Sequence, residues 1–175
     1  MENSKTIRSP FFYVGDKYKL MPQLKQLMPK NIEQYIEPFV GGGSSFLNSI
    51  GTSYMLNDVD SYVVELHRQI GSYTGKSEEL FGALFEIIDF YGLSCSYRGI
   101  CVPEDMKKKY VKTYYSKYNK DAYIRMRKDF NANKNDFLRL YLLLIYGFNH
   151  MIRFNGKGDF NLPVGNVDFN NNVYQ

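Results

Sequence analysis

Residues 35–44 read YIEPFVGGGS, an apolar stretch that runs directly into three consecutive glycines. This pattern is typical of a buried strand that ends in a tight turn, because glycine accepts backbone conformations closed to other residues. We therefore expect a strand over 34–40 with a glycine turn behind it. A helix should follow from Ser44 or Ser45 to about Ile50, since a serine side chain can cap the first backbone N–H groups.

The flanking segments continue the alternation of helix and strand. Apolar residues recur at helical spacing within 17–28, which predicts an amphipathic helix before the first strand. A second strand is expected over 53–59, followed by a helix from Asp60 or Ser61 through Ile70. Strand, turn, helix, strand and helix in this order indicate a parallel α/β unit.

Beyond Gly75 the pattern becomes helical. Periodicity predicts helices over 78–91, 104–118, 121–130 and 136–147, without a strand between them. From Phe148 onward Gly, Asn, Pro and Asp dominate, which indicates a loop or hairpin. We expect an α/β part over 1–75, a helical subdomain with a hairpin over 76–169, and a connection over 170–175.

Composition limits the class of protein. The chain has 175 residues, enough for one domain with a core, and 44% of them are apolar. No apolar run approaches the length of about 20 residues that a membrane span needs. Residues 1–8 are polar and lack the apolar middle of a secretory signal. We therefore expect a cytoplasmic protein.

Cysteine and histidine are sparse. Cys95 and Cys101 lack the CxxC spacing of metal sites and are expected to be two free thiols. His67 and His150 lie far apart, and no further ligands for a metal can be identified from the sequence. We predict no metal site.

Basic residues are concentrated between Lys107 and Arg139, where eleven lysines and arginines are interrupted by three aspartates. Tyrosines are interleaved with them. This mixture suits a polyanion, because lysines neutralise phosphates and release counterions. An equally good alternative is a solvated helix surface with half-buried tyrosines beneath it.

The glycine turn suits a ligand that contains a nucleoside. Glycines allow close approach of the backbone, and a helix N-terminus offers unpaired N–H donors. Ser45 and Phe46 occupy the later positions of a GxGxxG pattern, and no GK[ST] follows, which disfavours NAD and ATP. Asp58 ends the second strand, where a carboxylate can accept both hydroxyls of a ribose. S-adenosylmethionine has a ribose and no pyrophosphate; the alternative is a glycine turn chosen for geometry alone, with Asp58 capping the next helix.

Four motifs in order resemble those of the Dam-type (D12 class) DNA adenine-N6 methyltransferases. They are PFFYVGDKY (10–18), EPFVGGGS (37–44), LNDV (56–59), and YGFNHMIRFN (146–155) with GDFNLPVG (158–165). The resemblance covers nearly the whole chain. It implies a partial Rossmann-like S-adenosylmethionine-dependent methyltransferase fold with a helical DNA-recognition subdomain.

The resemblance also implies roles for the cofactor side. Tyr13 and Lys17 would contact S-adenosylmethionine, and Asp58 would hold its ribose. The cleft would be lined by Phe39, Gly41 and Gly43, with Val59 beside the adenine. The family often has tryptophan at position 13 and glycine at position 16, where this sequence has tyrosine and aspartate.

On the DNA side, the hairpin would read double-stranded DNA. Arg153 is the candidate for a bidentate contact with a guanine edge, and Phe148 could wedge between base steps beside a flipped adenine. The alternatives are a surface or salt-bridging arginine and a core aromatic that ends a helix. The reading surface would be completed by Asn149, Met151, Asn155 and Pro163. A GATC-containing site is the first expectation from the hairpin.

The catalytic Asp-Pro-Pro-Tyr tetrapeptide of the family is missing, since the sequence contains no Pro-Pro pair. We assign no catalytic residue and expect a fragment whose catalytic half lies elsewhere, with a second chain as a candidate partner. A sheet of two or three strands would leave an open edge, which predicts marginal stability or pairing. Two rivals stay open: a non-catalytic DNA-binding module derived from such an enzyme, and a different nucleotide-binding α/β enzyme.

Overall fold

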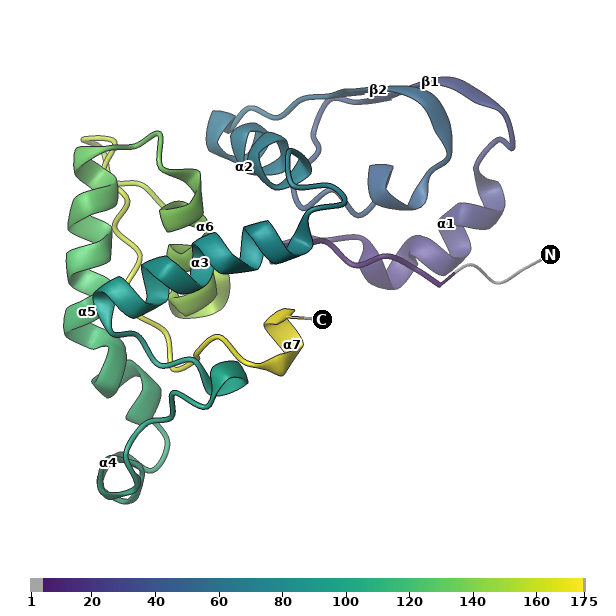
Figure 1. Cartoon of the computed structure of the whole chain (residues 1–175). Helices are drawn as coiled ribbons and strands as arrows, with labels where there is room; N and C mark the ends of the chain where they lie inside the picture. The colour runs from purple at the N-terminus through teal and green to yellow at the C-terminus, as the bar shows by residue number, and fades with distance from the viewer. Residues whose placement is uncertain (1–4, 175) are drawn as a thin grey trace. The chain divides into compact units, whose positions relative to one another are not determined.

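The computed structural model describes residues 5–174, which divide into two compact units, the first ending at Gly71 and the second beginning at Ser72 (Figure 1). The first unit carries the glycine motif. Its elements are the 3₁₀ turn η1 (Tyr18–Leu20), α1 (Met21–Leu27), β1 (Ile32–Glu37), the 3₁₀ turn η2 (Phe46–Asn48), β2 (Gly51–Leu56) and α2 (Ser61–Gly71). The predicted ranges 1–75, 76–169 and 170–175 remain predictions.

β1 and β2 form a parallel two-stranded sheet, with Ile32 opposite Gly51 and Glu37 opposite Leu56. Two further backbone bonds carry the pairing on to the glycine turn. The Asn57 N–H donates to Glu37 O (2.9 Å), and the Val40 N–H donates to Asn57 O (2.8 Å). The mixed α/β character and the parallel strand pair are thus confirmed, and each strand begins two residues before its predicted start.

The helix predicted from Ser44 or Ser45 to Ile50 is wrong, because only the short turn η2 forms there. The buried side chain of Asn48 explains the difference. Its Nδ2 donates to Ser44 O (2.8 Å), the carbonyl that an α-helix would offer to the Asn48 N–H. The same side chain bonds the N–H and C=O of Ile7, so it ties the N-terminal segment to this turn.

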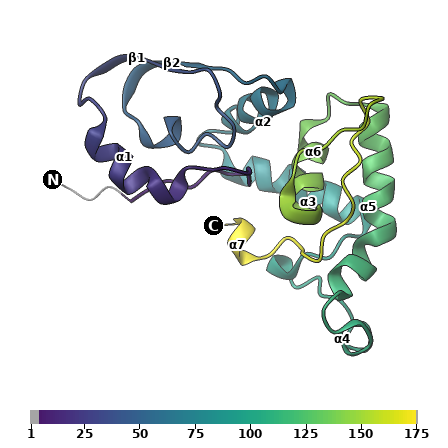
Figure 2. The same ribbon diagram turned by 180° about the vertical axis from the view of Figure 1, so that it is seen from behind.

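The second unit is helical and is seen from both sides in Figures 1 and 2. Its core is formed by α6, which is buried from Leu140 to Tyr146 and packs against α3 and α5. Tyr123 and Phe130 of α5 are fully buried in this core. The elements are α3 (Ser77–Tyr91), the 3₁₀ turn η3 (Ser96–Arg98), α4 (Glu104–Tyr110), α5 (Tyr114–Ala132), α6 (Phe137–Tyr146), the 3₁₀ turn η4 (Phe148–His150) and α7 (Asn171–Tyr174).

The predicted helices 104–118 and 121–130 are wrong in where they break. Helix α4 ends at Tyr110, and α5 continues without interruption through positions 119 and 120. Asn119, a poor helix former, is held in α5 by tertiary contacts. Its fully buried amide accepts from the Ser94 N–H (2.8 Å) and donates to Ser94 Oγ (2.9 Å).

The predicted hairpin follows α6 as two arms joined by isolated antiparallel bridges, Gly147 to Val164 and Phe154 to Phe160, with η4 in its first arm. Its tip is tied to the C-terminal end of α5, where the Lys134 ammonium binds Gly158 O (2.6 Å). α4 lies beyond the opposite end of α5 (Figures 1 and 2).

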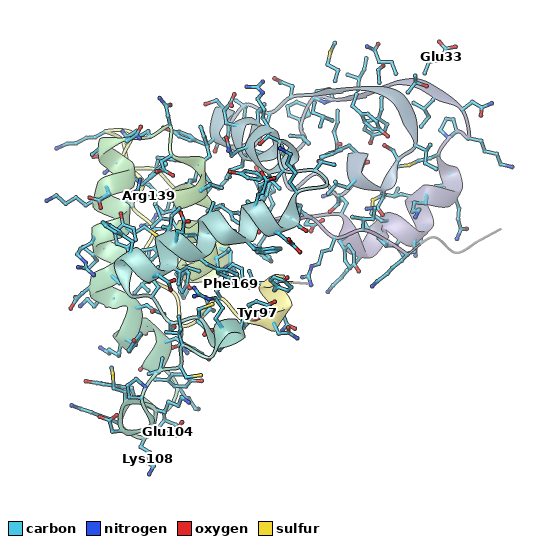
Figure 3. All side chains as sticks on the ribbon, in the orientation of Figure 1. Glu33, Tyr97, Glu104, Lys108, Arg139 and Phe169 are labelled. Carbon is cyan, nitrogen blue, oxygen red and sulfur yellow. The ribbon has the colours of Figure 1, made fainter. Side chains whose placement is uncertain are left out.

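The segment before α7 is fixed to η3. Asp168 is buried and accepts the N–H and the hydroxyl of Ser96 (2.8 and 3.1 Å). Figure 3 shows Tyr97 and Phe169 on neighbouring segments, and Tyr174 stacks on Tyr97 with ring centroids 4.0 Å apart. Within residues 5–174, no helix is both long and apolar enough to cross a bilayer.

Candidate functional site

The first unit brings the N-terminal motif onto the glycine turn. A Cβ added at Gly41 would lie 2.9 Å from Tyr13 Cε1, and one at Gly42 would lie 2.9 Å from Tyr13 Cβ. Both glycines are buried, as is Gly43. The turn therefore needs glycine because a tyrosine packs directly on its backbone, a contact that sequence spacing did not predict.

Asp16 joins the two motifs. Its carboxylate accepts the hydroxyl of buried Ser44 and the Tyr18 N–H (2.7 Å). Aspartate at the position where the family often has glycine therefore acts as a link. Lys17, a predicted cofactor contact, is exposed. Its ammonium donates to Gly15 O (2.6 Å), within the turn that precedes it.

Asp58 holds the glycine turn from the second strand. Its Oδ2 accepts the Gly41 N–H (2.9 Å) and its Oδ1 accepts the Asp60 N–H (3.1 Å). Burial raises the pKa of Tyr13, and the carboxylates of Asp58 and Asp60 add to this rise. Asp60 caps α2 by accepting the Tyr62 N–H (2.9 Å), so the helix-capping role weighed for Asp58 belongs to Asp60.

Phe39 and Val59 lie just beyond the carboxyl ends of β1 and β2. Their side chains are 79% and 92% exposed, which is unusual for two large apolar residues next to a buried turn. Both are therefore accessible to a flat apolar ligand. In the sequence, Phe39 stands two residues before Gly41, and Val59 directly follows Asp58.

The glycine turn fits a ligand with polar groups. Gly42 is buried, and within residues 5–174 neither its N–H nor its C=O has a hydrogen-bond partner. Buried backbone groups in folded proteins are nearly always paired, by solvent or a ligand where the protein offers nothing. The residues present thus fit a cofactor that carries hydroxyl, carboxylate or amine groups.

His67 of α2 is a part of this site that sequence analysis missed. Its Nε2 lies 2.8 Å from Gly41 O, and its ring packs against Phe11 and Phe46. Burial lowers the pKa of the imidazole below its ordinary value, against opposing effects of the Gly41 carbonyl and Asp58. The sequence offered no signal for it, since it stands nine residues after Asp58 within a helix.

In the second unit, Phe148 lies at the start of the hairpin with its side chain 54% exposed. The alternative of a core aromatic at the end of a helix is therefore wrong. Asn149 and His150 follow with positive φ angles of 55° and 53°, a left-handed conformation that is uncommon outside glycine. Met151 is exposed as well.

Arg153 is exposed and is oriented across the hairpin by Asn161. Its Nε donates to Asn161 Oδ1 (2.8 Å) and its Nη2 donates to Asn161 O (3.1 Å). Asn155 instead shapes the hairpin tip, because its Oδ1 accepts the N–H groups of Lys157 and Asp159 (2.9 and 3.0 Å). Pro163 pairs with the other arm through its carbonyl, which accepts the Phe148 N–H (2.9 Å).

The basic stretch divides into internal and external residues. Several side chains bind within the unit: Arg125 donates to Tyr91 O, Arg127 to Leu162 O and Lys134 to Gly158 O. Within the described residues, no hydrogen bond or ion pair engages the side chains of the exposed lysines at positions 108, 112, 120 and 128. The tyrosines are half-buried or buried, as the solvated-surface alternative predicted.

Comparison with known proteins agrees with the order of these motifs. Residues 13–174 match the family described as D12 class N6 adenine-specific DNA methyltransferase. The chain is 34% identical over 161 residues to the modification methylase StsI of Streptococcus sanguinis, covering 92% of this chain and 21% of that protein. It is 30% identical over 159 residues to the type II methyltransferase M.FokI of Planomicrobium okeanokoites, covering 91% and 21%.

A third relative is the DNA adenine methylase of Escherichia coli strain K12, which is 31% identical over 156 residues, covering 87% of this chain and 46% of that protein. The chain thus spans less than half the length of each of these relatives. The family match, by contrast, extends over almost all of its residues. The chain belongs to the D12 class of N6 adenine-specific DNA methyltransferases.

Proposed function

We propose that this chain is the cofactor-binding and DNA-recognising part of a site-specific DNA adenine-N6 methyltransferase that uses S-adenosylmethionine. The observation that carries the proposal is the joining of three motifs in one unit. Tyr13 packs on the glycine turn, and Asp58 binds the Gly41 N–H from the next strand. The first unit is then the cofactor half of a Rossmann-like methyltransferase fold.

Within this cleft, Asp58 would receive the ribose hydroxyls. Each carboxylate oxygen already accepts one backbone N–H and keeps a further acceptor position. Exposed Phe39 and Val59 would contact the adenine, and Tyr13 and Lys17 would contact the remainder of the cofactor. When bound, S-adenosylmethionine supplies the methyl group on a sulfonium sulfur.

The second unit would be the DNA-recognition subdomain. Phe148, exposed at the start of the hairpin, would wedge into the duplex, and Arg153 would read a guanine, with a GATC-containing site as the first candidate. Asn149 and Met151 would complete the reading surface together with Asn155 and Pro163, both of which also bond the hairpin backbone. The catalytic acceptor groups would come from outside these 175 residues, in the same polypeptide or in a second chain.

The cofactor proposal is tested by Asp58→Ala in calorimetry with S-adenosylhomocysteine. Hydrogen bonds to a charged group contribute about 1.5–3 kcal/mol each, so we expect the affinity to fall about 10- to 100-fold. Glu33→Ala is the matched control, since it removes an exposed carboxylate from β1 in the same unit. Unchanged binding by Asp58→Ala would contradict the ribose role, and DNA binding without any cofactor binding by the wild type would favour the non-catalytic module.

The DNA proposal is tested by fluorescence anisotropy with a GATC duplex and a scrambled duplex. Loss of a bidentate arginine contact costs about 1–3 kcal/mol, so Arg153→Ala should weaken cognate binding about 5- to 100-fold and leave scrambled binding nearly unchanged. Arg153→Lys keeps the charge without the planar fork and should lose discrimination to a similar degree. An equal loss on both duplexes would instead make Arg153 a phosphate contact.

A further inference from the structure

The peptide group between Gly41 and Gly42 is held from one side by His67. The His67 Nε2 lies 2.8 Å from Gly41 O, while the Gly41 N–H donates to Asp58 Oδ2 (2.9 Å). Both backbone groups of Gly41 are therefore bound by side chains that follow β2 in the chain. Glycine itself has few conformational restrictions, so these two bonds limit the orientations open to the Gly41 backbone.

The imidazole has little freedom to leave this position. Its ring centroid is 4.6 Å from that of Phe11 and 5.3 Å from that of Phe46. On the glycine side, a Cβ at Gly43 would lie only 2.6 Å from His67 Cε1, so backbone and ring are in close contact. Phe11 on one segment, and Gly43 and Phe46 on another, thus hold the ring in place.

The contact defines which ring nitrogen carries the proton. A carbonyl oxygen only accepts hydrogen bonds, so Nε2 must donate, and Nδ1 of the neutral ring is left as the acceptor. Burial lowers the pKa of His67, which favours the neutral form of the ring. The charge of the Asp58 carboxylate acts on this pKa in the opposite direction.

The planar peptide bond links the orientation of the Gly41 carbonyl to that of the Gly42 N–H. The described peptide bonds include no cis bond, so the Gly42 N–H points away from the Gly41 carbonyl in the same plane. Gly42 is a buried residue, and its N–H has no partner within residues 5–174. By holding the carbonyl, His67 sets the direction of an unpaired donor.

We propose that His67 is a positioning residue of the cofactor cleft, which aims the Gly42 N–H at an acceptor group of the bound nucleoside cofactor. This inference rests on the proposed cofactor function. His67 does not touch the cofactor itself. Its contribution is to select one orientation of the peptide plane before the ligand arrives.

Calorimetry with S-adenosylhomocysteine on the full chain tests the proposal with two variants. His67→Phe keeps a ring between Phe11 and Phe46 but removes the donor, and should weaken binding about tenfold, as expected for one hydrogen bond. His67→Gln places an amide N–H near the position of Nε2 and should bind within about threefold of the wild type. Rescue by glutamine separates a positioning donor from a ring that only fills space.

Nuclear magnetic resonance of the wild-type imidazole nitrogens gives an independent readout, because the sequence has only two histidines. We expect a protonated Nε2 and an unprotonated Nδ1 for His67, assigned by the loss of its signals in His67→Gln. An unprotonated Nε2, or full affinity in a folded His67→Phe, would overturn the proposal. Absence of binding by the wild type would instead reject the cofactor function, and the tautomer would still decide whether His67 donates to Gly41.

Discussion

The Gly43→Ala variant is expected to destabilise the first unit by about 2–5 kcal/mol and to abolish cofactor binding. Gly43 has a φ of +78°, and a left-handed conformation costs a residue with a Cβ about 1–2 kcal/mol. The new methyl group would also lie 2.6 Å from His67 Cε1 and closer still to Phe46 Cε1. Overpacking of this kind adds about 1–3 kcal/mol, because both rings are already wedged.

Gly15→Ala is a matched control for the conformational part of this cost. Gly15 has a φ of +85°, but a Cβ there would meet no atom within 4 Å. Urea unfolding, followed through amide signals of β1 and β2, should show a loss of only about 1–2 kcal/mol for Gly15→Ala. If both variants lost the same free energy, the ring contacts of Gly43 would be irrelevant to stability.

The Gly147→Ala variant should displace the hairpin that follows α6. Gly147 has an ordinary φ of −80°, so its substitution tests close packing alone. A Cβ would lie 2.5 Å from Leu143 O, closer still to Leu162 Cδ2, and 3.1 Å from Tyr123 Oη. The Leu143 carbonyl is part of α6 and cannot move without the helix, so we expect a loss of about 3 kcal/mol in the second unit.

Gly156→Ala in the same hairpin is the comparison, because a Cβ there meets nothing within 4 Å. Urea unfolding followed through amide signals of α5 and α6 measures stability. Anisotropy with cognate and scrambled duplexes measures recognition. We expect Gly147→Ala to discriminate less well than the wild type between the cognate and the scrambled duplex. Equal discrimination by the two proteins would show that any DNA reading by the hairpin does not depend on its packing against α6.

Sequence patterns predicted the elements with strong periodicity. α3 and α6 lie within one residue of the ranges expected from their apolar repeats. The errors arose where side chains compete with the backbone. Asn48 takes a carbonyl that a helix would need, while Asn119 remains helical because Ser94 binds its amide. Neither partner is visible from local sequence.

Some residues of the candidate site could be predicted from the sequence and others could not. Motif order singled out Tyr13, Gly41 and Asp58, and the fold brings them into contact, because each stands at a defined position beside a strand or turn; their role toward a cofactor stays a prediction. His67 and Asp16 act through contacts between segments that are separated along the chain, with Gly41 and Ser44 respectively. Only a three-dimensional structure reveals such partners, since any helix face offers several equivalent candidates.

Asn131 of α5 makes a contact that affects how the hairpin behaves towards other molecules. Its amide donates to Phe160 O (3.1 Å) and accepts the Phe160 N–H (2.8 Å), as a neighbouring strand would. Both main-chain groups of buried Phe160 are therefore paired on the side that faces α5, so the arm has no open strand edge there. A single side chain of α5 thus completes the hydrogen bonding of one hairpin arm in the way that a third strand would.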